Sequence, residues 1–196
     1  KQGDEPETDA WLGVFKSLDG GQTWKSTLLP GYRQDDSAPG RGSPLKDMQA
    51  GADAVVRAGT NGLFYYAGLE FSRNNSAKSR IFVARYIDDN SPTGGDTIRY
   101  VSTSVVYDGD AERFEDKPAF AADIPRANAK TCTIPGNPAQ SFAGGRLYTA
   151  WTEFDKKAGA ALDRKAKSRI LFSYSEDCGE TWSSPPRVLS NEGTNQ

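Results

Sequence analysis

Short runs in which apolar residues dominate, or alternate with polar ones, recur along the whole chain between segments rich in glycine, proline and serine. Runs of this length and pattern predict β-strands joined by turns. The predicted strands are Trp11–Lys16, Lys25–Leu29, Ala54–Arg57, Leu63–Phe71, Arg80–Tyr86, Ile98–Tyr107, Asp116–Asp123, Arg146–Thr152, Arg169–Tyr174 and Arg187–Leu189. Three segments, Gly31–Ala50, Pro125–Gly145 and Asp155–Ser168, are predicted to be long surface loops. The chain is therefore expected to be all-β.

One eight-residue phrase occurs twice, since Ser17–Trp24 and Ser175–Trp182 both read S-x-D-x-G-x-T-W. Five fixed positions, at about one chance in 15 each, give on the order of one match per million windows. Each phrase lies between two predicted strands and so predicts a hairpin corner. Its Asp and Ser/Thr oxygens would bond to local backbone, its Gly would permit a positive φ, and its Trp would pack on a neighbouring layer. The residues at the fixed positions are Ser17, Asp19, Gly21, Thr23, Trp24, Ser175, Asp177, Gly179, Thr181 and Trp182.

These phrases are Asp boxes, and the chain resembles the bacterial secreted type of the sialidase-like, BNR-repeat β-propeller family. In that family the box joins the third and fourth strands of a four-stranded antiparallel blade, on the face opposite the ligand site. Two further pairs of segments look like the opening strands of blades. They are Gly51–Val56 with Gly62–Leu69, and Asp116–Asp123 with Arg146–Thr152.

The resemblance implies three units. Residues 1–30 hold the outer hairpin of one blade with its Asp box, and residues 51–109 form a second blade whose third turn, Ile87–Asp96, carries a degenerate box. Residues 117–190 form a third blade that ends in the second box. About two and a half blades are thus expected from a six- or seven-bladed ring, and propellers need at least four. The chain is accordingly expected to be a fragment of a longer one, or to be completed by the remaining propeller blades or by other protein chains.

The two cysteines can be placed within this blade plan. In a four-stranded up-and-down blade, the turns after the first and third strands lie at the same end. Cys132 falls in the first of these turns of the third unit and Cys178 in the second, so the plan implies a Cys132–Cys178 disulfide. The alternative is two separate buried thiols. A disulfide indicates an oxidising compartment, in keeping with the secreted, periplasmic or cell-surface location that the resemblance implies.

Composition excludes several classes of function. The chain has no His and only two Cys, which excludes Ser-His-Asp and Cys-His catalysis, His-based zinc or iron sites, and a four-Cys metal site within it. We therefore expect no metal and no cofactor. The net charge of -2 and the lack of a long apolar run argue against nucleic-acid binding and against membrane insertion.

The resemblance places a set of charged residues at the end of the blades opposite the boxes, around the axis where propeller ligands bind. These residues are Asp53, Glu70, Arg113, Glu115, Asp116, Lys117 and Glu153. Asp53, Asp116 and Glu153 are the candidate catalytic residues, because paired carboxylates with a basic neighbour serve glycoside hydrolysis. In the alternative interpretation, Asp53 and Asp116 cap strand starts by accepting backbone N–H bonds.

Sialidases of this family carry an arginine triad that begins with an Arg-Ile-Pro phrase, a Tyr–Glu nucleophile pair and an Asp acid/base. Here Ile124–Arg126 has the same letters in another order, so the triad is not assigned. No phrase marks Tyr65, Tyr66, Tyr107 or Tyr148 as a nucleophile. The favoured hypothesis is a non-catalytic extracellular module for binding, adhesion or assembly, with glycans among the possible ligands. The alternative is an exo-sialidase-like glycoside hydrolase that acts on glycans through the rim carboxylates.

Overall fold

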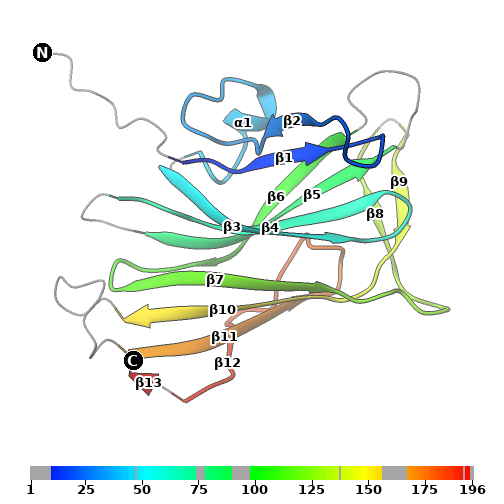
Figure 1. Cartoon of the computed structure of the whole chain (residues 1–196). Coiled ribbons are helices and arrows are strands. Elements are labelled where there is room, and N and C mark those ends of the chain that lie inside the picture. Colours follow the sequence, from blue (N-terminus) through cyan, green and yellow to red (C-terminus); the bar gives the residue numbers. More distant parts are fainter. Residues whose placement is uncertain are drawn as a thin grey trace, which may run out of the picture.

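A computed structural model describes residues 10–46, 48–73, 78–89, 98–136, 138–155, 167–191 and 193–194. Over these residues the protein is all-β, with one four-residue helix (Figure 1). The elements are β1 (Gly13–Lys16), β2 (Lys25–Leu28), α1 (Ala38–Arg41), β3 (Ala50–Ala58), β4 (Leu63–Phe71), β5 (Ser79–Asp88), β6 (Ile98–Asp108), β7 (Arg113–Ala122), β8 (Thr131–Ile134), β9 (Gln140–Ala143), β10 (Leu147–Asp155), β11 (Lys167–Ser175), β12 (Arg187–Val188) and β13 (Gly193–Thr194).

The strands form three stacked layers, seen from top to bottom in Figure 1. The hairpin sheet is β1–β2, the middle sheet runs β3-β4-β5-β6, and the lower sheet runs β7-β10-β11-β12, with β13 also pairing β11. Every strand pair is antiparallel, and none of these sheets closes on itself. A separate small hairpin, β8–β9, lies near the right-hand end of the stack in this view.

The central strands β4 and β5 of the middle sheet are buried on both faces, which explains their nearly continuous apolar runs. Alternate side chains such as Tyr66 and Phe82 pack towards Val14 of the hairpin sheet. Their neighbours, such as Tyr65 and Val83, pack in the opposite direction with Phe120 of the lower sheet. Since successive strand residues point to opposite faces, one pair of strands supplies both interfaces.

Two of the predicted loops contain secondary structure that the sequence analysis missed. Pro125–Gly145 holds the β8–β9 hairpin, whose Ile134 and Phe142 are 0% and 2% exposed. Gly31–Ala50 holds α1, which Ser37 caps by accepting a hydrogen bond from the Gly40 N–H at 3.1 Å. Neither segment is therefore a surface loop throughout, because part of each folds and packs against the rest of the molecule. Most of the expected degenerate box, from residue 90 onward, lies outside the described residues.

The first strands of the middle and lower sheets carry matching β-bulges. The β3–β4 register shifts between Ala52 and Val55, where Asp53 has a φ of 55°, and the β7–β10 register shifts where Lys117 has a φ of 52°. The two bulged residues meet, with Lys117 Nζ 3.3 Å from Asp53 Oδ2. β3 continues through its bulge to pair with the end of β4, so it begins at Ala50, earlier than predicted. A shared irregularity at one place indicates that the two sheets follow a common plan.

Candidate functional site

The two Asp-box corners form the same set of hydrogen bonds. In the first, the Ser17 hydroxyl donates to Asp19 Oδ1 at 2.8 Å and accepts from the Gly21 N–H at 2.7 Å. Asp19 Oδ1 also accepts from the Thr23 N–H at 2.9 Å, and Asp19 Oδ2 accepts from the Thr23 hydroxyl at 2.6 Å. These bonds, the Thr23 hydroxyl first, lower the pKa of Asp19 to about 2.

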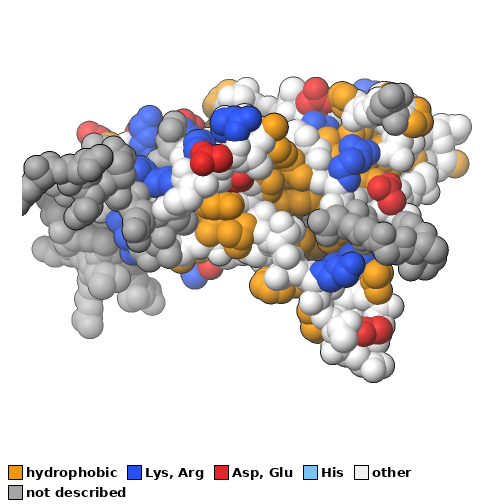
Figure 2. All heavy atoms as spheres, turned by 90° about the horizontal axis from the view of Figure 1, so that it is seen from above, with side chains coloured by type: hydrophobic (Ala, Val, Ile, Leu, Met, Phe, Trp, Pro, Cys, Tyr) orange, Lys and Arg blue, Asp and Glu red, His pale blue; other side chains and the backbone are white. Residues whose placement is uncertain are grey.

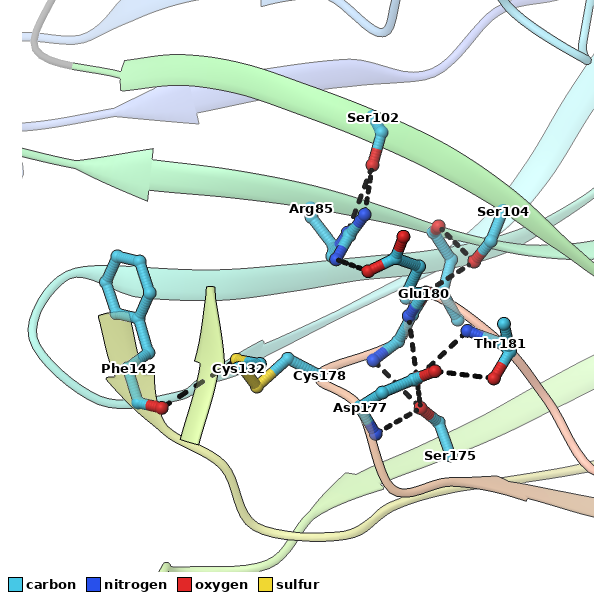
Figure 3. A network of polar contacts seen from close by, with 12 residues as sticks. Arg85, Ser102, Ser104, Cys132, Phe142, Ser175, Asp177, Cys178, Glu180 and Thr181 are labelled. Atoms are coloured by element: carbon cyan, nitrogen blue, oxygen red, sulfur yellow. Dashed lines mark hydrogen bonds and ion pairs between the residues drawn. A yellow bond between two sulfur atoms is a disulfide. The ribbon is translucent and has the colours of Figure 1, made fainter. Parts of the chain in front are cut away.

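The second corner repeats these contacts at Ser175, Asp177, Gly179 and Thr181, as Figure 3 shows. The corresponding distances are 2.7, 2.9, 2.9 and 2.5 Å. Burial opposes ionisation of Asp177, but the hydrogen bonds from Thr181 and Ser175 outweigh it and lower its pKa. In both corners the carboxylate is thus the acceptor that closes the turn.

The corners differ in what covers them. Trp182 is half-buried and donates from Nε1 to Ser104 Oγ of β6 at 3.0 Å, and Ser104 in turn donates to the Gly179 carbonyl at 2.7 Å. Glu180 lies 3.8 Å from Arg85 of β5 (Figure 3). Trp24 is instead 62% exposed and donates only to its own corner, at the Gly21 carbonyl, 3.0 Å away. The predicted packing of the box Trp on a neighbouring layer therefore holds for the second corner and not for the first.

The predicted disulfide is confirmed. Cys132 and Cys178 are bonded, with their Cα atoms 6.1 Å apart, so the alternative of two separate thiols is excluded. The bond ties the β8–β9 hairpin to the second corner (Figure 3). Cys178 has a φ of 56° and takes the place that Gly20, with a φ of 72°, holds in the first corner. An oxidising environment follows from this bond.

At the opposite end of the sheets lie three buried glutamates, Glu70, Glu115 and Glu153, exposed by 0, 0 and 2%. Glu115 and Glu153 pair across the β7–β10 ladder, and we call these two the Glu cluster. Glu70 pairs across the β4–β5 ladder with Arg80, and Glu153 pairs across the β10–β11 ladder with Arg169. The middle and lower sheets therefore repeat a Glu–Arg pair at corresponding positions. This repeat joins residues 10 apart in one sheet and 16 apart in the other, so no fixed sequence spacing reveals it.

Glu153 pairs with two arginines. Its Oε1 accepts from Arg113 Nη1 at 2.6 Å and from Arg169 Nε at 2.5 Å. The same hydrogen bond stabilises the charged form of Arg113, because Glu153 raises the pKa of that guanidinium. Two guanidinium groups on one oxygen offset the cost of burying the charge.

Glu115, the ladder partner of Glu153, is favoured in its protonated form. Burial first, and then the charge of Glu153, raise its pKa to about 8, although Trp151 Nε1 donates to its Oε2 at 2.5 Å. Its backbone N–H donates to Ser79 Oγ of the middle sheet at 2.8 Å. Glu115 is therefore protonated at neutral pH and lies across the interface between two sheets. Because its folded pKa lies above the unfolded value of about 4.5, it lowers stability progressively as pH rises from about 4.5 to about 8.

The three candidate catalytic residues do not share a site. Asp53 and Asp116 lie at the bulges of β3 and β7, where Asp116 Oδ1 accepts from the Lys117 N–H at 2.8 Å. Neither residue is at a strand start, so the strand-capping alternative does not describe them either. Thr152, the pairing partner of Asp116, neighbours Glu153 in β10, and adjacent strand residues point to opposite faces. Glu153 is thus turned into the interface with the middle sheet, together with Glu115, its partner across the β7–β10 ladder.

Glycoside hydrolysis needs two neighbouring carboxyl groups in different environments, and here Glu115 has a raised pKa while Glu153 pairs with two arginines. The obstacle to hydrolysis is that a substrate cannot reach these carboxyl groups. The cavity beside Glu153, which Arg113 and Arg169 also line, has a volume of about 20 Å³, whereas ligand pockets hold about 300–1,000 Å³. The arrangement favours a structural layer that locks the two sheets together.

Comparison of the chain with protein-family models, with curated proteins and with solved structures found no match. Within the described ranges, no group of three or more His, Cys, Asp or Glu side chains is arranged to hold a metal ion. The one helix of the described residues is too short to span a membrane.

Proposed function

We propose that this chain forms part of an Asp-box β-propeller that serves as a non-catalytic binding or assembly module in an oxidising, extracytoplasmic compartment. The successive sheets, their matching bulges and Glu–Arg pairs, and the two identical corners support this proposal. The disulfide supports the compartment.

The observation that carries the proposal is the outer face of the hairpin sheet. Phe15, Leu18, Trp24 and Leu28 are 64, 57, 62 and 46% exposed. The equivalent Trp182 packs against the sheet that precedes its own, so Trp24 presents a surface suited to another sheet of the same kind. Exposed apolar groups of this size concentrated on one small hairpin mark an interaction surface.

The far side of the stack is also partly apolar. Val188 and Leu189, at the outer edge of the lower sheet, are 53% and 59% exposed. A module with one such surface at each end can bind neighbours on both sides. In a propeller these neighbours are further blades, which come from the remainder of a longer chain or from other chains.

Glycoside hydrolysis remains the second candidate, and the raised pKa of Glu115 beside the arginine-paired Glu153 favours it. The two candidates can be separated by incubating the purified protein with fluorogenic aryl glycosides, an aryl sialoside included. We expect release at the buffer rate for the parent chain and for Glu153→Gln. Turnover that Glu153→Gln or Glu115→Gln abolishes, with both variants folded by circular dichroism, would overturn the non-catalytic proposal.

Self-association of the same purified protein can be measured by sedimentation velocity at increasing protein concentration. We expect concentration-dependent association of the parent chain, and its loss in Trp24→Glu, which places a charge on the exposed outer face. The matched control is Lys25→Glu, a charge change at an exposed position of β2 next to Trp24. A parent chain that sediments as a monomer throughout counts against assembly through this face.

A further inference from the structure

Within the described residues the hairpin sheet has two strands, whereas the middle and lower sheets each have at least four. β1 corresponds to β11, because each leads directly into an Asp box, and to β5, the third strand of the middle sheet. Both β5 and β11 have antiparallel neighbours on their two edges. Among the described strands, β1 pairs only with β2. One edge of β1 is therefore unpaired where its equivalents are paired.

Hydrogen-bond alternation identifies the groups on that edge. The Leu29 N–H donates to the Leu12 carbonyl at 2.9 Å, which makes this a hydrogen-bonded pair of the β1–β2 ladder. Because such pairs recur at every second residue, the peptide groups of Val14 face β2, and those of Gly13 and Phe15 face the other edge. The Gly13 carbonyl accepts from the Tyr66 hydroxyl at 3.1 Å. The edge therefore presents the Gly13 N–H and both polar groups of Phe15.

A groove of about 520 Å³ runs beside this edge, above the β3–β4 half of the middle sheet. Its floor is formed by side chains on one face of these strands: Ala54, Val56, Ala58, Phe64 and Tyr66. Val56 faces Tyr66 across the ladder and is 49% exposed, so the floor is apolar and open. Figure 2, which looks onto the stack from above, shows hydrophobic side chains at the surface in the middle of this face.

We propose that this groove is a strand-acceptor site. A short extended segment of another polypeptide pairs antiparallel with β1 and inserts apolar side chains, from alternate positions, over Val56 and Tyr66. Main-chain hydrogen bonds supply affinity and the apolar floor selects the side chains, as in other cases of strand addition to a sheet edge. The inference rests on the proposed binding function, because it names the chemistry of the partner.

Features of the stack define the incoming segment. At one end the chain crosses β3, where the Ala10 carbonyl accepts from the Gly51 N–H at 2.9 Å, so the pairing is limited to about the four residues of β1. In the lower sheet, β10 occupies the corresponding place beside β11, with Ala150 opposite Phe172. Side chains on that face of β10 alternate Tyr148, Ala150 and Thr152, which indicates small and aromatic residues in the segment.

The probe is a fluorescein-labelled peptide with the sequence of residues 146–153, measured by fluorescence anisotropy against the full chain. We expect saturable binding, with the Gly13 and Phe15 amides becoming protected from hydrogen exchange. Val56→Asp should weaken binding by about a hundredfold, because the charge would be buried unpaired. Phe15→Pro should weaken it by about tenfold, because it removes an N–H from the free edge.

Phe15→Ala is the matched control, since it removes the ring but keeps the N–H, and should bind within about threefold of the parent chain. Phe15→Pro leaves the β1–β2 ladder intact because its N–H faces away from β2, and its unfolding midpoint verifies this. Absence of saturable binding by the parent, or equal binding by Phe15→Pro, would overturn the acceptor site. If the peptide does not bind and no glycoside is hydrolysed, the acceptor site is wrong and the proposed non-catalytic function stands. If a glycoside is hydrolysed, the proposed function is wrong whether or not the peptide binds.

Discussion

The two Asp-box corners share their bonds and differ in their surroundings. Both hold a carboxylate between a Ser hydroxyl and a Thr hydroxyl, at nearly equal distances. Asp19 nevertheless lies in an exposed corner, and Asp177 in one that touches the middle sheet and carries a disulfide. The eight-residue Asp-box sequence thus specifies the turn, and the presence or absence of a sheet packed against the turn determines how far it is buried.

This difference separates local from tertiary stabilisation within one molecule. The first corner has only its internal hydrogen bonds, which are screened by water. The second adds the ion pair of Glu180 with Arg85, the Ser104 bridge and the Cys132–Cys178 bond. Substitutions at matched positions therefore measure what the extra layer contributes.

The largest expected effect is that of the disulfide. Replacing both cysteines by Ser should lower the free energy of unfolding by about 4 kcal/mol, from the entropy of a 46-residue loop. The double variant Cys132→Ser with Cys178→Gly should be about 1 kcal/mol more stable than the double Ser variant, because Gly adopts the positive φ of position 178 without strain. Urea unfolding of the three proteins gives the comparison. Equal stability of the two double variants would show that the left-handed position carries no strain.

Next in size is the contrast between the two tryptophans. Trp182→Ala should cost about 3 kcal/mol, because it opens a gap against Phe120 and removes the bond to Ser104. Trp24→Ala should change stability by less than about 0.5 kcal/mol, since its ring is mostly exposed. Thermal unfolding monitored by circular dichroism measures both. A large loss for Trp24→Ala would mean that its exposed face is covered in solution, for example by a second molecule.

Much of the fold was accessible from the sequence because strands and corners are local. The period-two runs predicted β4 at its observed bounds and located most other strands to within a few residues. The disulfide could be predicted because one blade plan brings the two turns to the same end. The α1 helix also had a local signal, a Ser cap followed by a Pro, which was not used.

The Glu cluster was predicted only as a charged rim, because its geometry depends on register across long turns. The bulges at Asp53 and Lys117 place non-glycine residues at positive φ without any turn residue to mark them. Asp116 pairs with Thr152, and Glu153 is the next residue of β10, so strand alternation turns Asp116 and Glu153 to opposite faces of the sheet. The protonation of Glu115 arises from burial between two sheets, a tertiary property.

The smallest effect distinguishes the corner carboxylates by pH. Both have folded pKa values below the ordinary value of 3.8, so each contributes stability that is present above pH 3.8 and is lost as pH falls through the folded pKa. At pH 7, Asp177→Asn should cost about 1 kcal/mol, because charge-assisted bonds become neutral ones. The cost should shrink as pH falls below 3.8 and through the lowered pKa of Asp177, because the parent side chain then loses its own charge. Asp19→Asn should also lower stability at neutral pH and lose this effect in acid, but by a smaller amount, because the first corner is open to water. Denaturant midpoints at pH 7, 4 and 2 test this, and a cost for Asp177→Asn that persists unchanged at pH 2 would show that shape, rather than charge, holds the corner closed.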